Sequence, residues 1–129
     1  MDAPNPTEGE LAILRVLWSR NQPMTVRQVH AVLSRNKTTA YTTVLKMLTI
    51  MAEKGLVRRD DSERSHTYVA VEAEPVVQAS LLQDLMRRAF SGSALTLVQR
   101  ALDDDLASSE DLDEIARLIA KAKAKRKQA

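Results

Sequence analysis

Apolar residues recur three and four positions apart along most of the 129-residue chain, which places them on one face of a helix. The first two helical segments open on capping boxes, Thr7 with Glu10 and Thr25 with Gln28, in which each side chain satisfies an otherwise unpaired backbone N–H. Gly55 is expected to end the third helix, because glycine readily adopts the left-handed conformation found after helices. Six helices are predicted, over residues 7–19, 25–33, 38–54, 75–91, 93–102 and 109–120.

The helical spacing of apolar residues ends between residues 56 and 71, where strand-forming residues surround a polar segment. Leu56–Arg59 and His66–Val71 are predicted strands, and the polar residues 60–63 are typical of the turn between them. Three helices followed by a hairpin is the order of a winged helix-turn-helix. We therefore predict a mostly α fold with a small β-hairpin wing. The expected organisation is a winged-helix DNA-binding domain over 1–73, a helical dimerisation region over 74–120, and a basic, disordered tail over 121–129.

The helices of the second half carry apolar faces but a single aromatic residue, Phe90. A segment of this size can hardly close a core by itself, so its apolar faces need another surface. A second copy of the chain is the expected surface, and folding back onto the first domain is the alternative. The residues expected in the dimer seam are Val77, Leu81, Leu85, Leu95, Val98, Leu102, Leu112, Ile115 and Ile119.

Charge is distributed unevenly, although the net charge is only +2. Residues 27–59 hold seven bases and one acid, residues 74–120 hold four bases and nine acids, and residues 121–129 hold five bases. A basic block followed by an acidic one favours a polyanion-binding module joined to a protein-binding region. Uneven surface charge without a function is the alternative.

The predicted third helix begins with polar side chains suited to DNA. In a helix-turn-helix, the N-terminal residues of the recognition helix contact base edges in the major groove. A threonine hydroxyl can bond to bases or phosphates, and its methyl group can pack on thymine. We expect Val44, Leu45 and Leu48 on the opposite, buried face. The predicted base-reading residues are Thr39, Thr42, Thr43 and Lys46; the predicted backbone contacts are Arg35, Lys37, Tyr41, Arg58 and Arg64, with Thr38 at the helix start.

Several of these side chains have a second interpretation. The threonines can simply cap the helix, which is the favoured role for Thr38. Tyr41 can reach a phosphate with its hydroxyl group or brace the preceding helix. His66 on the hairpin can face either DNA or solvent, and His30 is assigned no chemistry.

Composition sets several other classes aside. The chain has no cysteine, so it has no disulfide framework, thiolate nucleophile or cysteine-based zinc site. It has two histidines, no glycine-rich phosphate loop and no catalytic motif, so no catalytic residue, metal or cofactor is predicted. No apolar run approaches membrane-spanning length, and the start lacks the basic and apolar parts of a signal peptide. A reducing cytoplasm is the expected location.

Five segments carry a resemblance to a known family: Thr7–Trp18, Met24–Leu33, Tyr41–Leu45, Glu53–Val57 and Arg64–Tyr68. In these segments the sequence resembles the penicillinase-repressor (BlaI/MecI) family of bacterial transcription repressors, over roughly residues 7–120. The series YTTVL, EKGLV, R and Y is fairly specific to that family. The resemblance implies a homodimer whose N-terminal winged helix binds an inverted-repeat operator and whose helical C-terminal region dimerises. It also implies a membrane-bound sensor peptidase as inducing partner, with beta-lactam or other envelope stress as one candidate signal.

The chain departs from the family pattern at three points. Glu63 precedes Arg64 at the wing tip, where the family often has glycine. The C-terminal cysteines of the copper-responsive branch are absent, which argues against copper sensing. Val98-Gln99 stands at the best match to the Asn-Phe bond at which members of the family are cut. Two other functions stay open: a winged-helix regulator with a small-molecule pocket, and a protein-interaction adaptor that binds no DNA.

Overall fold

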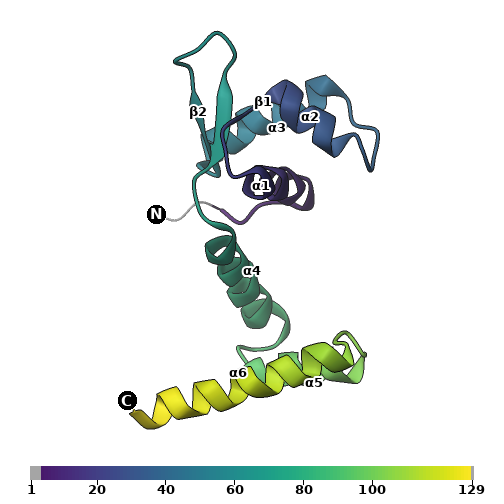
Figure 1. Cartoon of the computed structure of the whole chain (residues 1–129), viewed down its shortest axis with the longest axis vertical. Helices are drawn as coiled ribbons and strands as arrows, with labels where there is room; N and C mark the ends of the chain where they lie inside the picture. The colour runs from purple at the N-terminus through teal and green to yellow at the C-terminus, as the bar shows by residue number, and fades with distance from the viewer. Residues whose placement is uncertain (1–3, 129) are drawn as a thin grey trace. The chain divides into compact units, whose positions relative to one another are not determined.

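The computed structural model describes residues 4–128, and the chain divides into two compact units, one up to Leu82 and one from Gln83 onward. Figure 1 shows their helices and strands. The division falls within a helix, later in the chain than the predicted boundary after residue 73. The first unit contains α1 (Glu8–Arg20), β1 (Met24–Thr25), α2 (Val26–Leu33), α3 (Tyr41–Lys54), β2 (Val57–Asp60), β3 (Thr67–Ala70) and the start of α4 (Glu74–Ala89). The second contains the rest of α4, α5 (Ala94–Asp103) and α6 (Ser109–Gln128).

Both predicted capping boxes are confirmed. The Thr7 hydroxyl accepts from the Glu10 N–H at 3.2 Å, and the Glu10 carboxylate accepts from the Thr7 N–H at 2.9 Å. Thr25 and Gln28 repeat the arrangement at the start of α2. Gly55 ends α3 with a φ of 83°, as predicted from the ease with which glycine adopts the left-handed conformation.

The wing belongs to a three-stranded antiparallel sheet with strand order β1-β3-β2. The predicted hairpin is formed by β2 and β3, in which Arg59 pairs with Tyr68. Met24 of β1 pairs with Tyr68 on the other side of the central strand. The sequence pattern did not predict β1, because two residues are too few to show a period of two.

The core of the first unit lies between α1, α2, α3 and the sheet. Along α3 its buried residues are Val44, Leu48 and Met51, spaced by four and three positions on one face. Leu45 was expected in this core but is 42% exposed, because each residue turns the helix by about 100° and carries Leu45 away from Val44. The apolar stripe is therefore completed by Met51 and not by Leu45.

A buried ion pair links the first turn of α1 to the last residue of α3. The Lys54 ammonium group lies 2.7 Å and 2.9 Å from the two carboxylate oxygens of Glu10. The Glu10 side chain is only 6% exposed, and that of Lys54 is 28% exposed. Burial raises the pKa of the Glu10 carboxyl, but Lys54 and the Thr7 N–H lower it by more, so the pKa lies below the ordinary value.

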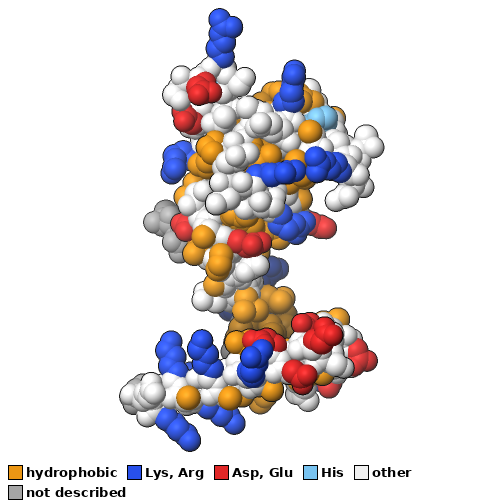
Figure 2. Space-filling view, viewed as in Figure 1, with side chains coloured by type: hydrophobic (Ala, Val, Ile, Leu, Met, Phe, Trp, Pro, Cys, Tyr) orange, Lys and Arg blue, Asp and Glu red, His pale blue; other side chains and the backbone are white. Residues whose placement is uncertain are grey.

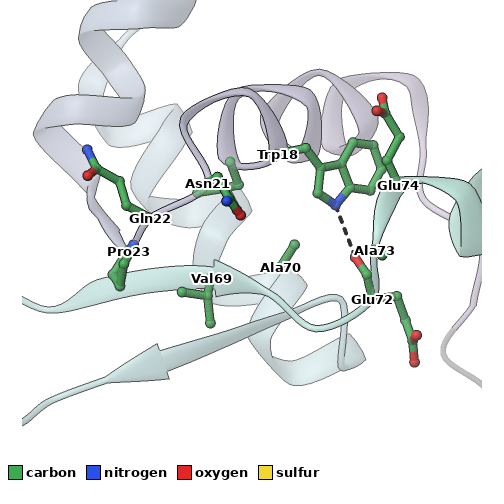
Figure 3. Close-up of a pocket in the computed structure, with 10 residues that line it drawn as sticks. Trp18, Asn21, Gln22, Pro23, Val69, Ala70, Glu72, Ala73 and Glu74 are labelled. Atoms are coloured by element: carbon green, nitrogen blue, oxygen red, sulfur yellow. Dashed lines mark hydrogen bonds between the residues drawn. The ribbon is translucent and has the colours of Figure 1, made fainter.

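Trp18 fastens α1 to the segment that follows β3, because its indole N–H donates to the Glu72 carbonyl at 3.0 Å (Figure 3). A groove of about 430 Å³ lies beside the indole and is lined on its other sides by Pro23, Val69 and Ala70, among others. None of the predicted DNA-binding residues lines this groove.

In the second unit each helix start is capped by serine. Ser93 accepts from the Thr96 N–H at 3.0 Å at the start of α5, and Ser108 accepts from the Asp111 N–H at 3.1 Å at the start of α6. Helix α6 continues to Gln128, so the expected disordered tail over 121–129 is wrong for residues 121–128, while residue 129 lies outside the described residues. Alanine, lysine and arginine favour helices, and cations are stabilised near a helix C-terminus.

No helix in the described residues combines the length and the apolar character needed to cross a membrane.

Candidate nucleic-acid interface

Helix α3 begins at Tyr41, later than the predicted start at Thr38. Thr38 and Thr39 therefore lie in the segment before the helix, and the position that caps α3 is Ala40, which makes no side-chain cap. The Thr39 hydroxyl instead donates to the Lys37 carbonyl at 3.1 Å. Such local side-chain bonds compete with helix formation, which explains the shorter helix. The expectation that Thr38 caps the helix is wrong.

The first two turns of α3 present a polar outer face. Thr42, Thr43 and Lys46 are all exposed there, away from the buried stripe that begins at Val44. Tyr41 is also exposed, but it lies three positions before Val44, at the edge of that stripe. Thr39 is half-buried in the preceding segment and does not share this face. The outer face is thus built as predicted, apart from Thr39.

His30 holds the start of α3 against α2. Its Nε2–H donates to the Thr39 carbonyl at 2.6 Å, since a carbonyl oxygen only accepts. Its ring also meets Tyr41 edge to face, with ring centroids 5.8 Å apart and planes at 73°. Of the two roles expected for Tyr41, the structure therefore contains the brace against α2. This role of His30 was not predicted from the sequence, because a half-buried residue at the edge of a short helix leaves no periodic signal.

Four of the predicted backbone-contacting bases surround α3 or lie on the wing, and all are exposed. Arg35 and Lys37 lie between α2 and α3, Arg58 lies on β2, and Arg64 lies in the β2–β3 turn. Figure 2 shows lysine and arginine side chains projecting from this first unit. Among the described residues, none of the four forms an ion pair with a protein carboxylate.

Two bases of the predicted basic block are occupied by protein carboxylates. Lys54 is held by Glu10, and the Arg59 Nε lies 2.8 Å from the Asp61 carboxylate. Asp61 also bonds to the His66 ring, so His66 stabilises the wing turn from within. Hydrogen bonding from His66 and the charge of Arg59 lower the pKa of Asp61. Fewer bases are therefore available to a polyanion than the seven that the sequence holds in residues 27–59.

The residues predicted for the dimer seam fall into three sets, according to their burial in the single chain. Val77 lies in the first unit and is only 8% exposed, so its predicted place in the seam is wrong: this unit already buries it. Leu81 and Ile115 are partly buried. The others remain exposed apolar side chains on α4, α5 and α6, namely Leu85, Leu95, Val98, Leu102, Leu112 and Ile119.

Nothing in the described part of the chain groups three or more histidine, cysteine, aspartate or glutamate residues as a metal site would require. The polar residues brought together by α2, α3 and the wing are threonines, bases and one tyrosine. Such a set can bind phosphates and base edges.

Comparison with known proteins identifies the family. The chain matches the family model described as penicillinase repressor over residues 6–121. It is 41% identical to the transcriptional regulator BlaI of Mycobacterium tuberculosis over 80 residues, which are 62% of this chain and only 58% of the relative's length. The penicillinase repressor of Bacillus licheniformis is 22% identical over 125 residues, 97% of each chain.

Structural comparison supports the fold assignment of the first unit. The solved DNA-binding domain of the repressor BlaI has a TM-score of 0.50 and 23% identity to this protein, covering 57% of this chain and 88% of that one. Likeness at this level confirms the predicted winged-helix fold. Since the family model spans most of the chain, the protein belongs to the penicillinase-repressor family, whose members are transcription regulators and not enzymes.

Proposed function

We propose that this protein is a transcriptional repressor that binds operator DNA by inserting the start of α3 into the major groove. The observation that carries the proposal is the exposed polar face of Thr42, Thr43 and Lys46, on the helix whose other face is buried through Val44, Leu48 and Met51. A recognition helix needs this arrangement, because base edges are read by side chains near its N-terminus. An adaptor that binds only protein has no need of a threonine-rich helix start bordered by exposed bases.

The proposal divides the contacts into two kinds. Thr42, Thr43 and Lys46 read bases, with Thr39 adding a contact from the preceding segment and Thr38 lying beside it. The surrounding residues bind phosphates and fix the orientation of the domain without reading sequence. These phosphate-binding residues are Arg35, Lys37, Tyr41, Arg58 and Arg64.

Two substitutions test this division. Lys37→Ala is expected to weaken binding to every duplex and to reduce the slope of log affinity against log salt by about one unit, as for one lost phosphate contact. Thr43→Ala is expected to cost about 1 kcal/mol on the operator while leaving random DNA unaffected, because it removes a base contact. Fluorescence anisotropy with both duplexes over a salt series measures these effects.

The chain offers a matched control for each substitution. Arg15→Ala removes an exposed base from α1, and Thr49→Ala removes an exposed threonine further along α3. Both should bind like the wild type. Equal losses on operator and random DNA for Lys37→Ala and Thr43→Ala would contradict the division of roles. Footprinting on the region upstream of the gene provides the operator for these measurements.

The operator is proposed to be an inverted repeat bound by a homodimer. The support is the set of exposed apolar side chains on α4, α5 and α6, which a water-exposed monomer leaves uncovered. A two-fold dimer places two recognition helices on one side of the duplex. The two half-sites should then lie about one helical turn apart, or a multiple of it.

Relief of repression is proposed to come from a membrane-bound sensor peptidase, which the family resemblance implies. Along the chain, the connection between α4 and α5 precedes most of the exposed apolar residues of the last three helices, and the connection between α5 and α6 precedes those of α6. A cut there leaves each winged helix with half of the DNA contacts and no tether. Blotting after induction should show a fragment that ends within residues 90–108; derepression with only full-length protein would reject cleavage.

A further inference from the structure

Helix α6 carries opposite charges at its two ends. We call residues 110–114 its acidic start, with Glu110, Asp111, Asp113 and Glu114, and residues 121–127 its basic end, with Lys121, Lys123, Lys125, Arg126 and Lys127. Figure 2 shows blue side chains along one end of this helix and red side chains towards the other. A 20-residue helix is about 30 Å long, so the two groups cannot pair within one copy.

The second half of α6 has little to pack against in its own unit. Helix α5 has 10 residues against the 20 of α6, so it can cover only about half the length. Ile119 is 49% exposed. Within the described residues, no base of the basic end pairs with a carboxylate. Ile119 and the bases are therefore available to another surface.

The apolar stripe of α6 has the three-and-four spacing of a helix that packs along another helix. Leu112, Ile115, Ile119 and Ala122 follow one another by three, four and three positions, which keeps them on one face. When two copies of this helix run antiparallel about a two-fold axis, Ile115 of each lies opposite Ile119 of the other. Leu112 then lies opposite Ala122, a large residue against a small one.

We propose that the basic end of α6 binds the acidic start of α6 in a second copy of the chain, with the two helices antiparallel. The inference rests on the proposed dimer and adds its register. Asp111 and Lys125 flank the apolar stripe on the same side, two heptads apart. The two-fold axis brings Asp111 of each copy to Lys125 of the other, so the pair forms twice.

Charge complementarity identifies the occupant. An antiparallel pair sets acids against bases at both ends, whereas a parallel pair would set acids against acids and bases against bases. Exposed charges of this kind contribute little affinity individually but discriminate strongly between registers, because juxtaposed like charges repel. The surface that complements the basic end is therefore the acidic start of α6 in a second copy of the chain.

A charge-reversal experiment tests the register on the full-length protein. Lys125→Glu and Asp111→Lys are each expected to raise the dimer dissociation constant on the order of tenfold or more, since each homodimer then contains two repulsive contacts. Mixing the two variants should restore wild-type affinity, because both contacts of the heterodimer are attractive again. Sedimentation of each variant alone, and of the mixture with one partner fluorescently labelled, measures the dissociation constants.

Matched controls lie on the opposite face of the same helix. Lys121→Glu and Glu110→Lys make the same charge changes at the same ends but point away from the stripe, so they should dimerise like the wild type. Circular dichroism confirms that all variants keep their helix content.

The outcomes separate this inference from the proposed dimer. A monomeric wild type would overturn both. A dimeric wild type whose Lys125→Glu and Asp111→Lys variants dimerise equally well would overturn the register alone. Weak homodimers without recovery in the mixture would also overturn it, because the two residues then do not face each other. Loss of DNA affinity in Lys125→Glu with unchanged dimerisation would assign the basic end to DNA.

Discussion

Leu85→Asp is expected to lower affinity for a two-half-site operator by about 100- to 10,000-fold, because separate winged helices lose the effective concentration that a dimer provides. Leu85 lies on α4 in the second unit and is 48% exposed in the single chain. In the proposed dimer this surface is buried, and an unpaired carboxylate there is strongly destabilising. Affinity for a single half-site should stay unchanged, since α3 and the wing are untouched.

Sedimentation and operator binding, measured on the same samples, check this result. Gln83→Asp is the control, because it places the same charge on an exposed polar position of the same helix. It should remain dimeric. A Leu85→Asp protein that stays dimeric would place the seam elsewhere, and an equal loss on the half-site would mean that the substitution damages the first unit.

Glu10→Ala is expected to destabilise the first unit by about 2–4 kcal/mol, between the value for an exposed ion pair and that for a fully buried one. The substitution removes both carboxylate contacts of Lys54 and the side-chain acceptor of the Thr7 N–H. Urea unfolding at neutral pH measures the loss. Glu8→Ala, an exposed acid on the same turn, should change stability little. Equal effects of the two substitutions would show that the buried pair contributes nothing specific.

The ion pair of Glu10 and Lys54 makes the unfolding free energy of the first unit depend on pH. The folded-state pKa of Glu10 is lowered, so the ionised carboxylate contributes its full stabilisation above the ordinary value of 4.5. That stabilisation is lost as the pH falls through the lower pKa of the folded state. Glu10→Gln cannot titrate, so the difference in unfolding free energy between wild type and variant should shrink as the solution is acidified. A difference that stays constant from neutral pH to pH 3 would contradict the assignment.

Local features of this fold were predictable from sequence. The capping boxes at Thr7 and Thr25 depend on residues three positions apart, and Gly55 ends α3 through its own backbone preference. Helical spacing also separates Val44 and Leu48 from the polar face of α3. Each signal is contained within a few residues, so no knowledge of the tertiary structure is needed.

Features that depend on distant contacts were not predictable. The bond from His30 to the Thr39 carbonyl and the pairing of Met24 with Tyr68 appear only when separate elements are brought together. Lys54 was counted among the bases available to DNA, although Glu10, far away in sequence, binds it. The error at the start of α3 has a local cause. The bond from the Thr39 hydroxyl to the Lys37 carbonyl competes with helix formation, so the helix begins later than predicted.

The ion pair of Lys54 bears on how related repressors can diversify. The segment Glu53–Val57, part of the series by which the family was recognised, closes the core: Lys54 binds Glu10, Gly55 takes the left-handed conformation, and Leu56 and Val57 are buried. The exposed residues proposed to read DNA lie outside this segment. Operator preference can therefore change through Thr42, Thr43 and Lys46 while the core-closing segment Glu53–Val57 stays intact, so two proteins that share this segment need not share a binding site.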